Sequence, residues 1–243
     1  MAIILFDVDG TLTPSGDIIQ PIMSHYLSIF SQKEGIELGI VGGGNYDKIK
    51  WQMQDSLKYF KYVFAECGAV IYVDGKLIAE KNMLDYCDRN VLNNIVKKAL
   101  SEISQMPIIY HGNQIDFRKG LVYISPPGMQ ATNFERNIFI DLDTKLGVRK
   151  ELLNKLNSFD SDEQFEITLG GAVGVAVYPK GWNKSQVLKY FSENNIKDDI
   201  YYFGDRCEPD GNDYPIYIHP LVNGVAVKDY KDTIMKLSKI FIE

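Results

Sequence analysis

Two short apolar runs open the chain and predict buried parallel strands. Residues 2–6 are apolar without a break and stop at Asp7, and residues 37–41 repeat the signal before three glycines. Runs of this length that are apolar on both faces are typical of a parallel sheet covered by helices. An amphipathic stretch over 22–30 lies between them, so the opening is predicted to be strand–helix–strand. A third strand is predicted at 62–64.

The middle of the chain has a different order of predicted elements. After a predicted hairpin over 70–78, the spacing of apolar residues predicts a helix from Val91 to Ile103 with Asp88 as its N-cap. The further expected elements are strands over 108–110, 115–118, 121–125, 165–169 and 174–178, and helices over about 133–142 and 149–157. Consecutive strands with interspersed helices favour a separate α+β unit with a mostly antiparallel sheet.

The opening pattern returns near Lys184. A helix over 185–194, strands over 200–203, 216–218 and 224–227, and a final helix over 229–241 are predicted there. The predicted fold class is therefore α/β, with a doubly wound parallel-sheet core and an inserted α+β domain. We expect residues 1–81 and 184–243 to form the core, and residues 83–181 to form a cap carried on two hinges.

Composition and charge exclude several classes of protein. The 243 residues, 45% of them apolar, suffice for one large domain or two modest ones. A formal net charge of −6 gives no general attraction to nucleic acid or anionic membranes. Three scattered cysteines, Cys67, Cys87 and Cys207, lack metal-ligand spacing. With neither a signal-peptide pattern nor an apolar segment of the roughly 20 residues that cross a bilayer, we expect a cytoplasmic protein without nucleic-acid or membrane partners.

The first candidate site follows the first predicted strand directly, as Asp7-Val8-Asp9-Gly10-Thr11. Ligands in parallel sheets bind beyond the carboxyl ends of the strands, and alternation along an extended chain sends Asp7 and Asp9 to the same side. Gly10 frees the backbone to turn, and Thr11 offers a hydroxyl to a phosphate oxygen. Helix capping or a turn would explain one of the two carboxylates but not both, so a catalytic role is favoured.

A second acidic cluster follows the strand predicted at 200–203, and it comprises Asp205, Asp210, Asn212 and Asp213. Such a cluster alone is more commonly a surface loop. Two clusters at strand ends favour Mg²⁺, which takes one or two carboxylates together with substrate phosphate. Asp205 is the first choice as ligand, with Asn212 and Asp213 in the outer shell.

Lys184 is a candidate cation for the same site. It stands where the chain returns to the core, so it could contact both the phosphate and the Asp7 carboxylate. An isolated lysine is usually solvated, so the assignment of Lys184 to the site depends on its position in the chain.

Short motifs occur in one order along nearly the whole chain: Phe6-Asp7-Val8-Asp9-Gly10-Thr11-Leu12-Thr13, Val41-Gly42-Gly43, Asp74-Gly75-Lys76-Leu77, Phe117-Arg118-Lys119-Gly120, Ser125-Pro126, Glu135-Arg136, Tyr178-Pro179-Lys180-Gly181-Trp182-Asn183-Lys184, and Phe203-Gly204-Asp205 with Pro209-Asp210-Gly211-Asn212-Asp213. The first and last indicate only the haloacid dehalogenase (HAD) superfamily of phosphotransferases. Together, and through Gly-Trp-Asn-Lys and Phe-Arg-Lys-Gly above all, they resemble the eukaryotic-type phosphomannomutases.

The resemblance implies a mechanism on a HAD-type core. Asp7 would attack a phosphoryl group to form an aspartyl phosphate, and Asp9 would protonate the leaving oxygen and later activate the acceptor hydroxyl. Asp7, Asp205 and the Asp9 carbonyl would hold Mg²⁺, which neutralises phosphate charge.

The resemblance also implies a substrate and partners. Thr11, Gly43, Gly44 and the cap cations Arg118 and Arg136 would bind a phosphorylated sugar, with mannose phosphate as the expected sugar. Enzymes of this family interconvert hexose 6- and 1-phosphates through a bisphosphate, so hexose 1,6-bisphosphate would be an activator. The product would serve GDP-mannose biosynthesis. A homodimer would form through the cap.

Five positions depart from the family pattern. Gly16 and Met129 stand where the family has arginine, Gly44 and Gly174 where it has serine, and Ala176 where it has aspartate. A mutase must hold both ends of its bisphosphate, whereas a phosphatase needs one end and water.

Three hypotheses therefore stay open. Whole-chain resemblance favours a sugar-phosphate mutase, and the substitutions favour a phosphatase with an altered substrate. A non-catalytic binding protein would be expected to lose Asp7 or Asp9, and this chain has both.

Overall fold

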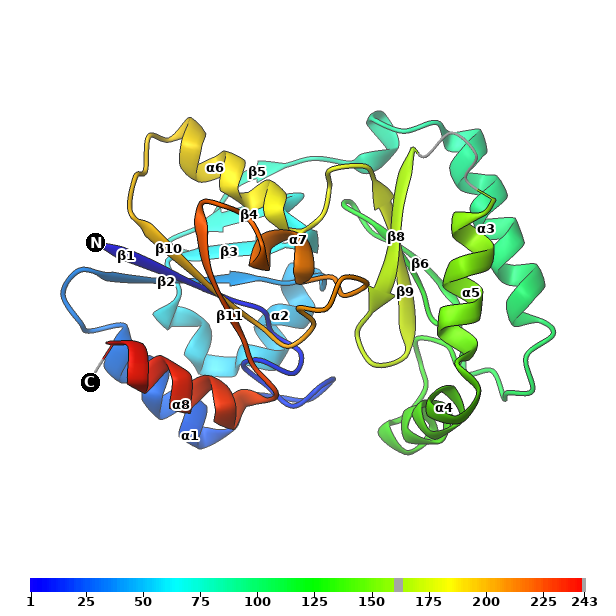
Figure 1. Cartoon of the computed structure of the whole chain (residues 1–243), viewed down its shortest axis with the longest axis horizontal. Coiled ribbons are helices and arrows are strands. Elements are labelled where there is room, and N and C mark those ends of the chain that lie inside the picture. Colours follow the sequence, from blue (N-terminus) through cyan, green and yellow to red (C-terminus); the bar gives the residue numbers. More distant parts are fainter. Residues whose placement is uncertain (160–163, 242–243) are drawn as a thin grey trace. The chain divides into compact units, whose positions relative to one another are not determined.

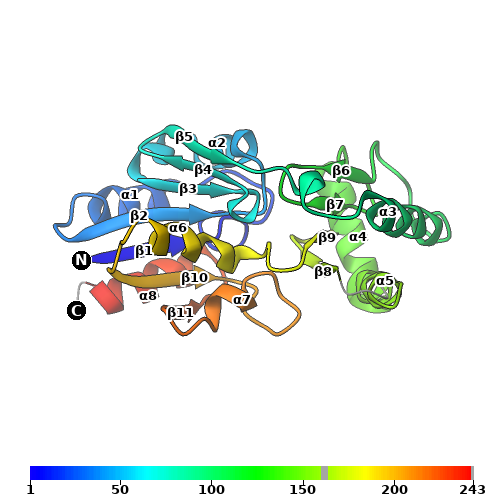
Figure 2. The same ribbon diagram turned by 90° about the horizontal axis from the view of Figure 1, so that it is seen from above.

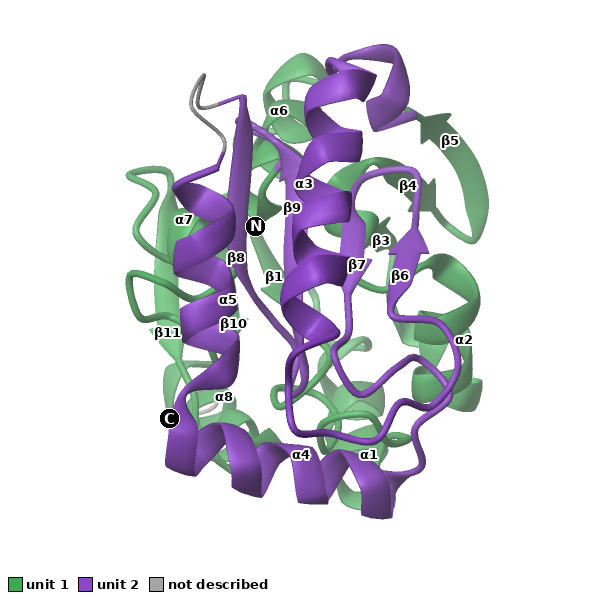
Figure 3. Ribbon diagram, turned by 90° about the vertical axis from the view of Figure 1, so that its right-hand side faces the viewer, with its two compact units in different colours: residues 1–81, 183–243 green, residues 82–182 purple. Residues whose placement is uncertain are grey.

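A computed structural model describes residues 1–159 and 164–241, and the chain forms two compact units (Figure 3). Unit 1 comprises Met1–Lys81 and Asn183–Glu243, and unit 2 comprises Asn82–Trp182. The α/β class predicted from the sequence is confirmed, with one mostly parallel sheet and one antiparallel sheet. No helix within the described ranges combines the length and the apolar character that crossing a membrane requires.

Unit 1 is built on a sheet whose described strands run in the order β11-β10-β1-β2-β3-β4-β5. Their bounds are β1 (Ala2–Phe6), β2 (Ile36–Val41), β3 (Tyr62–Ala65), β4 (Val70–Val73), β5 (Lys76–Glu80), β10 (Asp199–Gly204) and β11 (Val222–Ala226). The strands from β11 to β3 pair in parallel, and β4 and β5 add an antiparallel hairpin at the edge. Figure 2 shows this sheet with β1 near its centre.

Helices cover both faces of this sheet (Figure 1). They are α1 (Pro21–Phe30), α2 (Tyr46–Met53), α6 (Val187–Glu193), α7 (Tyr214–Tyr217) and α8 (Tyr230–Phe241), with 3₁₀ turns at Gln54–Tyr59, Glu66–Gly68 and Lys184–Gln186. In β1, Ile4 and Phe6 pack with α1, α2 and α8, whereas Ile3 and Leu5 pack with α6 and α7. The unbroken apolar run of β1 is thus explained by burial on both faces.

Unit 2 has an antiparallel sheet in the order β6-β7-β9-β8. Its elements are the 3₁₀ turn Met83–Asp85, α3 (Arg89–Ile103), β6 (Ile115–Phe117), β7 (Val122–Ile124), α4 (Asn133–Leu146), α5 (Val148–Asn157), β8 (Phe165–Gly170) and β9 (Gly174–Pro179). Alternate residues of β7 and β9, such as Val122 and Val175, share an apolar cluster with α3 and α5. Those two helices therefore cover one face of the sheet (Figure 3).

Two predicted strands are wrong. Residues 108–110 form no strand, because Ile109 is exposed and the Tyr110 hydroxyl donates to the Ile103 carbonyl (2.8 Å) instead of entering a sheet. Residues 216–218 belong mostly to the short helix α7, which has a proline in its first turn and buries Ile216 completely. Three or four apolar residues do not distinguish a strand from a buried helical turn.

Candidate active site

Three aspartates meet at the carboxyl ends of two neighbouring strands of unit 1. Asp7 follows β1 and Asp205 follows β10, and these two strands pair in parallel. One carboxylate oxygen of each of Asp7, Asp205 and Asp213 lies within 4.8 Å of the others. The sheet thus brings together acidic residues from both ends of the chain, at the edge where parallel sheets bind ligands.

Gly10 allows the first loop to approach Asp205. Its φ is +85°, in the left-handed region, and a Cβ atom at this position would lie 2.5 Å from Asp205 Oδ2. Any other residue would be strained there and would collide with the carboxylate. The close approach of the two acidic clusters therefore requires this glycine.

Lys184 is the counter-ion of the cluster, and its side chain is fully buried. Its ammonium group donates to Asp7 Oδ1, to Asp213 Oδ1 (2.6 Å) and to the Tyr202 hydroxyl oxygen (3.3 Å). The Tyr202 hydroxyl donates in turn to Asp213 Oδ1 (2.5 Å), and the Arg206 N–H donates to Asp213 Oδ2 (2.9 Å). Burial of these charges is possible because they are paired and hydrogen-bonded.

These surroundings shift the carboxyl pKa values in different directions. Burial raises the pKa of Asp7, with the charges of Asp213 and Asp205 adding to it and Lys184 opposing. Burial also raises the pKa of Asp205, to about 6. Burial favours a higher pKa at Asp213 too, but the ammonium of Lys184 outweighs it and the net shift is downward. Asp7 and Asp205 are therefore the carboxylates that an added cation would stabilise most.

Two buried oxygens suit a hard cation at this place. Asp205 Oδ1 and Asn212 Oδ1 are buried and have no hydrogen-bond partner among the described residues, although buried polar atoms are normally paired. Carboxylate and amide oxygens are ligands that Mg²⁺ accepts. The neighbouring carboxylates of Asp7 and Asp205 fit this ion, and the unpaired Asn212 oxygen is a further candidate ligand from the same loop as Asp213. Both Asp213 oxygens are already hydrogen-bonded, which fits an outer position.

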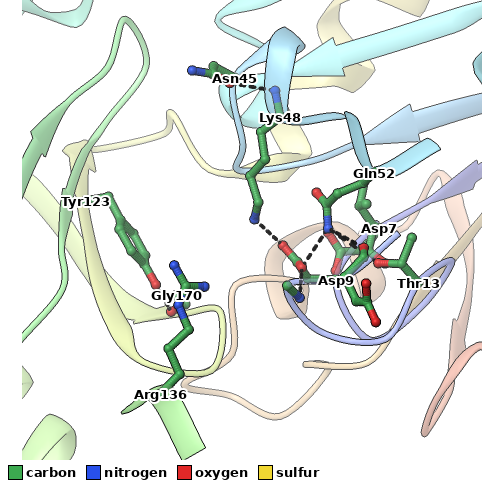
Figure 4. A network of polar contacts seen from close by, with 12 residues as sticks. Asp7, Asp9, Thr13, Asn45, Lys48, Gln52, Tyr123, Arg136 and Gly170 are labelled. Atoms are coloured by element: carbon green, nitrogen blue, oxygen red, sulfur yellow. Dashed lines mark hydrogen bonds and ion pairs between the residues drawn. The ribbon is translucent and has the colours of Figure 1, made fainter. Parts of the chain in front are cut away.

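Asp9 has its own set of hydrogen-bond donors in unit 1 (Figure 4). Its Oδ2 accepts from the Lys48 ammonium (2.6 Å), and its Oδ1 accepts from the Gln52 amide (2.9 Å) and from the Gly16 N–H (2.6 Å). Burial favours a higher pKa at Asp9, but the charge and hydrogen bond of Lys48, with the other two donors, outweigh it, so the pKa of Asp9 is lowered. The two carboxylates of the Asp-x-Asp motif thus have opposite pKa shifts.

Two departures from the family pattern lie beside Asp9 and its partner Lys48. Gly16 has a φ of +74°, where an arginine would be strained, and its N–H already binds Asp9. A Cβ atom at Gly44 would lie 3.1 Å from Lys48 Cδ, so a serine there would crowd the lysine. Gly44 therefore fits the position of Lys48, and Gly16 fits the hydrogen bond of its N–H to Asp9.

The other predicted phosphate contacts of unit 1 lie near its strand ends. The Thr11 hydroxyl is buried and has no hydrogen-bond partner within residues 1–159 and 164–241, while its carbonyl accepts from the Thr233 hydroxyl (2.8 Å). Gly43 follows β2, and a Cβ atom there would be 3.9 Å from Cys67 Sγ. Thr11 thus has a donor available for an anion.

The two predicted cap cations lie in unit 2, and both have protein partners. Arg118 Nε donates to Asp116 Oδ2 (2.7 Å), and the guanidinium lies 4.9 Å from the centre of the Tyr123 ring. Arg136 donates to the carbonyls of Ala131 (3.0 Å) and Met129 (3.4 Å). These contacts fix the two guanidinium groups against their own sheet and loop.

The residues of these networks that were not predicted include Lys48, Gln52, Tyr202 and Tyr123. Lys48 and Gln52 are four positions apart on α2, whose N-cap Asn45 accepts from the Lys48 N–H (2.9 Å). An N-cap followed by helical spacing is a signal that could have found α2. No sequence signal marks Tyr202 or Tyr123, because their roles depend on sheet register.

Comparisons with known proteins agree with the motifs. A family model described as eukaryotic phosphomannomutase matches residues 23–243. Phosphomannomutase 1 of Homo sapiens is 32% identical over 241 residues, covering 98% of this chain and 91% of that protein. The phosphomannomutase of Babesia bovis is 34% identical over 241 residues, covering 98% of this chain and 96% of that protein.

Solved structures support the same fold at lower identity. An IMP-bound, N-terminally truncated IMP-nucleotidase of Plasmodium falciparum has a TM-score of 0.69 and 17% identity, covering 100% of this chain and 68% of that one. SMU.1108c from Streptococcus mutans UA159 has a TM-score of 0.66 and 12% identity, covering 99% of this chain and 98% of that one. The family match over most of the chain is the stronger finding, and the chain belongs to the eukaryotic phosphomannomutase family.

Proposed function

We propose that this protein is a phosphotransferase that interconverts hexose 6-phosphate and hexose 1-phosphate, with mannose phosphate as the sugar. The observation that carries the proposal is the cluster of Asp7, Asp205 and Lys184 at the carboxyl ends of β1 and β10. Family membership supports the same reaction.

Asp7 is the proposed nucleophile. Lys184 contacts its Oδ1 and limits the rotation of the carboxylate, so Oδ2 is the oxygen left to attack phosphorus and form an aspartyl phosphate. The Thr11 hydroxyl can donate to an oxygen of the transferred phosphoryl group. Mg²⁺ held by Asp7, Asp205 and Asn212, with the Asp9 carbonyl, would favour the ionised Asp7 and neutralise charge on the phosphoryl group.

Asp9 is the proposed general acid and base. Lys48 and Gln52 donate to its carboxylate and favour the ionised form, which is the form that removes a proton from an acceptor hydroxyl. The proton that Asp9 removes from the acceptor hydroxyl in one half-reaction is the proton it returns to the leaving oxygen in the next, so between the two steps Asp9 is neutral and its ion pair with Lys48 is weakened. A hexose 1,6-bisphosphate is then the intermediate, and as a free compound it would activate the enzyme.

A phosphatase is the second candidate, favoured by the uncharged residues Met129, Gly174 and Ala176 in unit 2. These side chains offer no charged group for a second phosphate or for sugar hydroxyls. With only one end of the substrate held, water could replace the second hydroxyl as acceptor.

Phosphorus NMR of the purified protein with mannose 1-phosphate and Mg²⁺ distinguishes the two candidates. The reaction is followed with and without added hexose 1,6-bisphosphate, and with Asp7→Asn as the inactive control. We expect mannose 6-phosphate to form, faster with the bisphosphate. Release of free phosphate alone would identify the phosphatase, and no change in either signal would refute both.

Family membership also supports a homodimer formed through residues 83–181, which would act as a cap on the core. Light scattering coupled to size-exclusion chromatography would measure its mass. A monomer at all protein concentrations would contradict this part of the proposal.

A further inference from the structure

Asp213 differs from the other two aspartates of the cluster in unit 1, because protein donors already occupy both of its oxygens. Its Oδ1 accepts from the Lys184 ammonium (2.6 Å) and from the Tyr202 hydroxyl (2.5 Å), and its Oδ2 accepts from the Arg206 N–H (2.9 Å). One of its oxygens nevertheless lies within 4.8 Å of an oxygen of each of the other two aspartates. Asp213 is therefore near enough to be a third ligand of an ion held by the cluster, but its hydrogen bonds oppose this.

The sheet of unit 1 fixes the place of the Tyr202 hydroxyl. Tyr202 lies within β10, opposite Leu5 of β1 and Gly224 of β11 in the register. Its side chain is completely buried on the face that packs with α6 and α7. Because a strand paired on both sides cannot shift and a tightly packed ring cannot easily turn, the hydroxyl is held at Asp213.

Gly204 brings the Asp213 carboxylate against the same strand. A Cβ atom at Gly204 would lie 2.7 Å from Asp213 Cγ and 2.7 Å from its Oδ2, so the carboxylate packs directly on the backbone of β10. This backbone and the surrounding donors hold the carboxylate in one orientation. Without the Tyr202 hydroxyl, Lys184 would be the remaining donor to Oδ1 within the described part of the chain.

The number of carboxylates that reach an ion influences which ion a site prefers. Mg²⁺ is usually held by one or two carboxylates and keeps several of its waters, whereas Ca²⁺ takes about six to eight oxygen ligands and binds more tightly as the charge of those ligands rises. Two available carboxylates therefore suit Mg²⁺. A third would strengthen the binding of Ca²⁺ more than that of Mg²⁺.

We propose that Tyr202 is a positioning residue that withholds Asp213 from the metal ion and so makes the site prefer Mg²⁺ to Ca²⁺. The inference rests on the proposed function, because it takes Asp7 and Asp205 as the carboxylates that hold the ion. Tyr202 acts through Asp213. The same hydrogen bond keeps Asp213 paired with Lys184, since a carboxylate drawn to the ion would leave the buried ammonium with fewer partners.

The proposal is tested by ion binding, without any substrate. After removal of metal with a chelator, the midpoint of thermal unfolding is measured at increasing concentrations of MgCl₂ or CaCl₂ at constant ionic strength, which gives a dissociation constant for each ion. We expect the wild type to bind Mg²⁺ more tightly than Ca²⁺. In Tyr202→Phe, which keeps the ring and removes the hydroxyl, detaching Asp213 costs one hydrogen bond less. We expect the dissociation constant of Ca²⁺ to fall about tenfold relative to that of Mg²⁺.

Two further comparisons show whether the effect passes through Asp213. Tyr201→Phe is the matched control, because it removes a hydroxyl from the adjacent position of β10, on the opposite face, where the ring lies 4.9 Å from that of Phe241. It should leave the ratio of the two dissociation constants unchanged. Tyr202→Phe is also made in an Asp213→Asn background, where the amide keeps the shape of the side chain without its charge. There we expect the gain in Ca²⁺ binding to disappear.

The outcomes separate this inference from the proposed function. An unchanged ratio in Tyr202→Phe, an equal change in Tyr201→Phe, or a gain that survives in the Asp213→Asn background would overturn the role of Tyr202. So would a wild type that prefers Ca²⁺ or binds neither ion, or a Tyr202→Phe protein without a cooperative unfolding transition, since a positioning role leaves the fold intact. Ion binding as expected in a protein that turns over no phosphate ester would instead refute the proposed function and leave the role of Tyr202 standing.

Discussion

The two carboxylates of the Asp-x-Asp motif have opposite surroundings although one residue separates them. Asp7 is buried beside two other aspartates and its pKa is raised, whereas Asp9 is held by Lys48 and its pKa is lowered. When the environments of two neighbouring carboxylates give them different pKa values, one commonly acts as the nucleophile and the other transfers protons. This division supports a nucleophile at Asp7 and a proton-transfer group at Asp9.

Removal of Lys184 should strongly destabilise the protein. Lys184→Met leaves the buried carboxylates of Asp7 and Asp213 without their counter-ion, and breaking a buried ion pair in this way costs about 3–5 kcal/mol. Urea unfolding followed by circular dichroism measures the change. Lys189→Met is the control, because Lys189 is exposed and pairs only loosely with Glu193 (3.6 Å). A loss below about 1 kcal/mol would contradict a role of Lys184 as structural counter-ion.

Single residues also show the limit of prediction from the sequence. Asp7 and Asp205 could be placed together because both follow apolar runs, and parallel strands align their carboxyl ends. Lys48 could not be assigned to Asp9, because the contact depends on the rotation of α2 about its axis, which no motif fixes. The full burial of Lys184 was equally unpredictable, since an isolated lysine is usually solvated.

At the scale of elements, β2 and β3 are joined by a charged cluster that should make stability depend on alkaline pH. Glu37 accepts from Lys61 (2.5 Å) and from the Tyr62 hydroxyl (2.8 Å). The hydrogen bond to Glu37 raises the pKa of Lys61 to about 12, and burial, with the same carboxylate, raises the pKa of Tyr62 to about 12. Both groups thus keep their protons in the folded protein at pH values where the unfolded chain loses them.

The sign follows from proton binding. Between about pH 10 and pH 12 the folded state binds more protons than the unfolded state, so stability falls as the pH rises. We expect the free energy of unfolding to drop by about 1 kcal/mol for Tyr62 between pH 9 and pH 11, and by less in Glu37→Gln. Urea titrations at the two pH values measure both drops. Equal drops in the two proteins would contradict the assignment to this cluster.

Elements were predicted well where the apolar pattern was long and poorly where it was short. The pattern over 91–103 and the N-cap Asp88 agree with α3, and the Asp74-Gly75 turn agrees with the β4–β5 hairpin. The strands predicted at 108–110 and 216–218 were wrong, because tertiary packing decides the structure of such short apolar runs. The helix α2 was not predicted, because its sequence is mostly polar and its buried residues are only Ile49, Gln52 and Met53.

At the scale of the whole molecule, the chain has all of the proposed transfer residues but fewer of the substrate contacts that the family pattern implies. We expect it to be a poor phosphomannomutase. Each lost hydrogen bond to a charged group costs about 1.5–3 kcal/mol, so losing two weakens transition-state binding by roughly 10²- to 10⁴-fold. Met129→Arg with Ala176→Asp should recover part of the turnover of mannose 1-phosphate, while Gly174→Ser should help only with Tyr123→Ala, because a Cβ atom at Gly174 would lie 2.2 Å from Tyr123 Cζ.

Steady-state kinetics with mannose 1-phosphate check this expectation. A wild-type kcat/KM of about 10⁴ M⁻¹s⁻¹ or more, ordinary for an enzyme, would mean that the substitutions are tolerated and that the argument from them is wrong.

The most direct test of the central claim is intact-protein mass spectrometry after brief mixing with p-nitrophenyl phosphate and Mg²⁺, followed by peptide mapping. This donor has a good leaving group and needs little help from Asp9. The account predicts a gain of one phosphoryl group on Asp7, none in Asp7→Asn, and accumulation in Asp9→Asn, where the acceptor is no longer activated. A phosphoryl group on any other residue, or one that persists in Asp7→Asn, would contradict it.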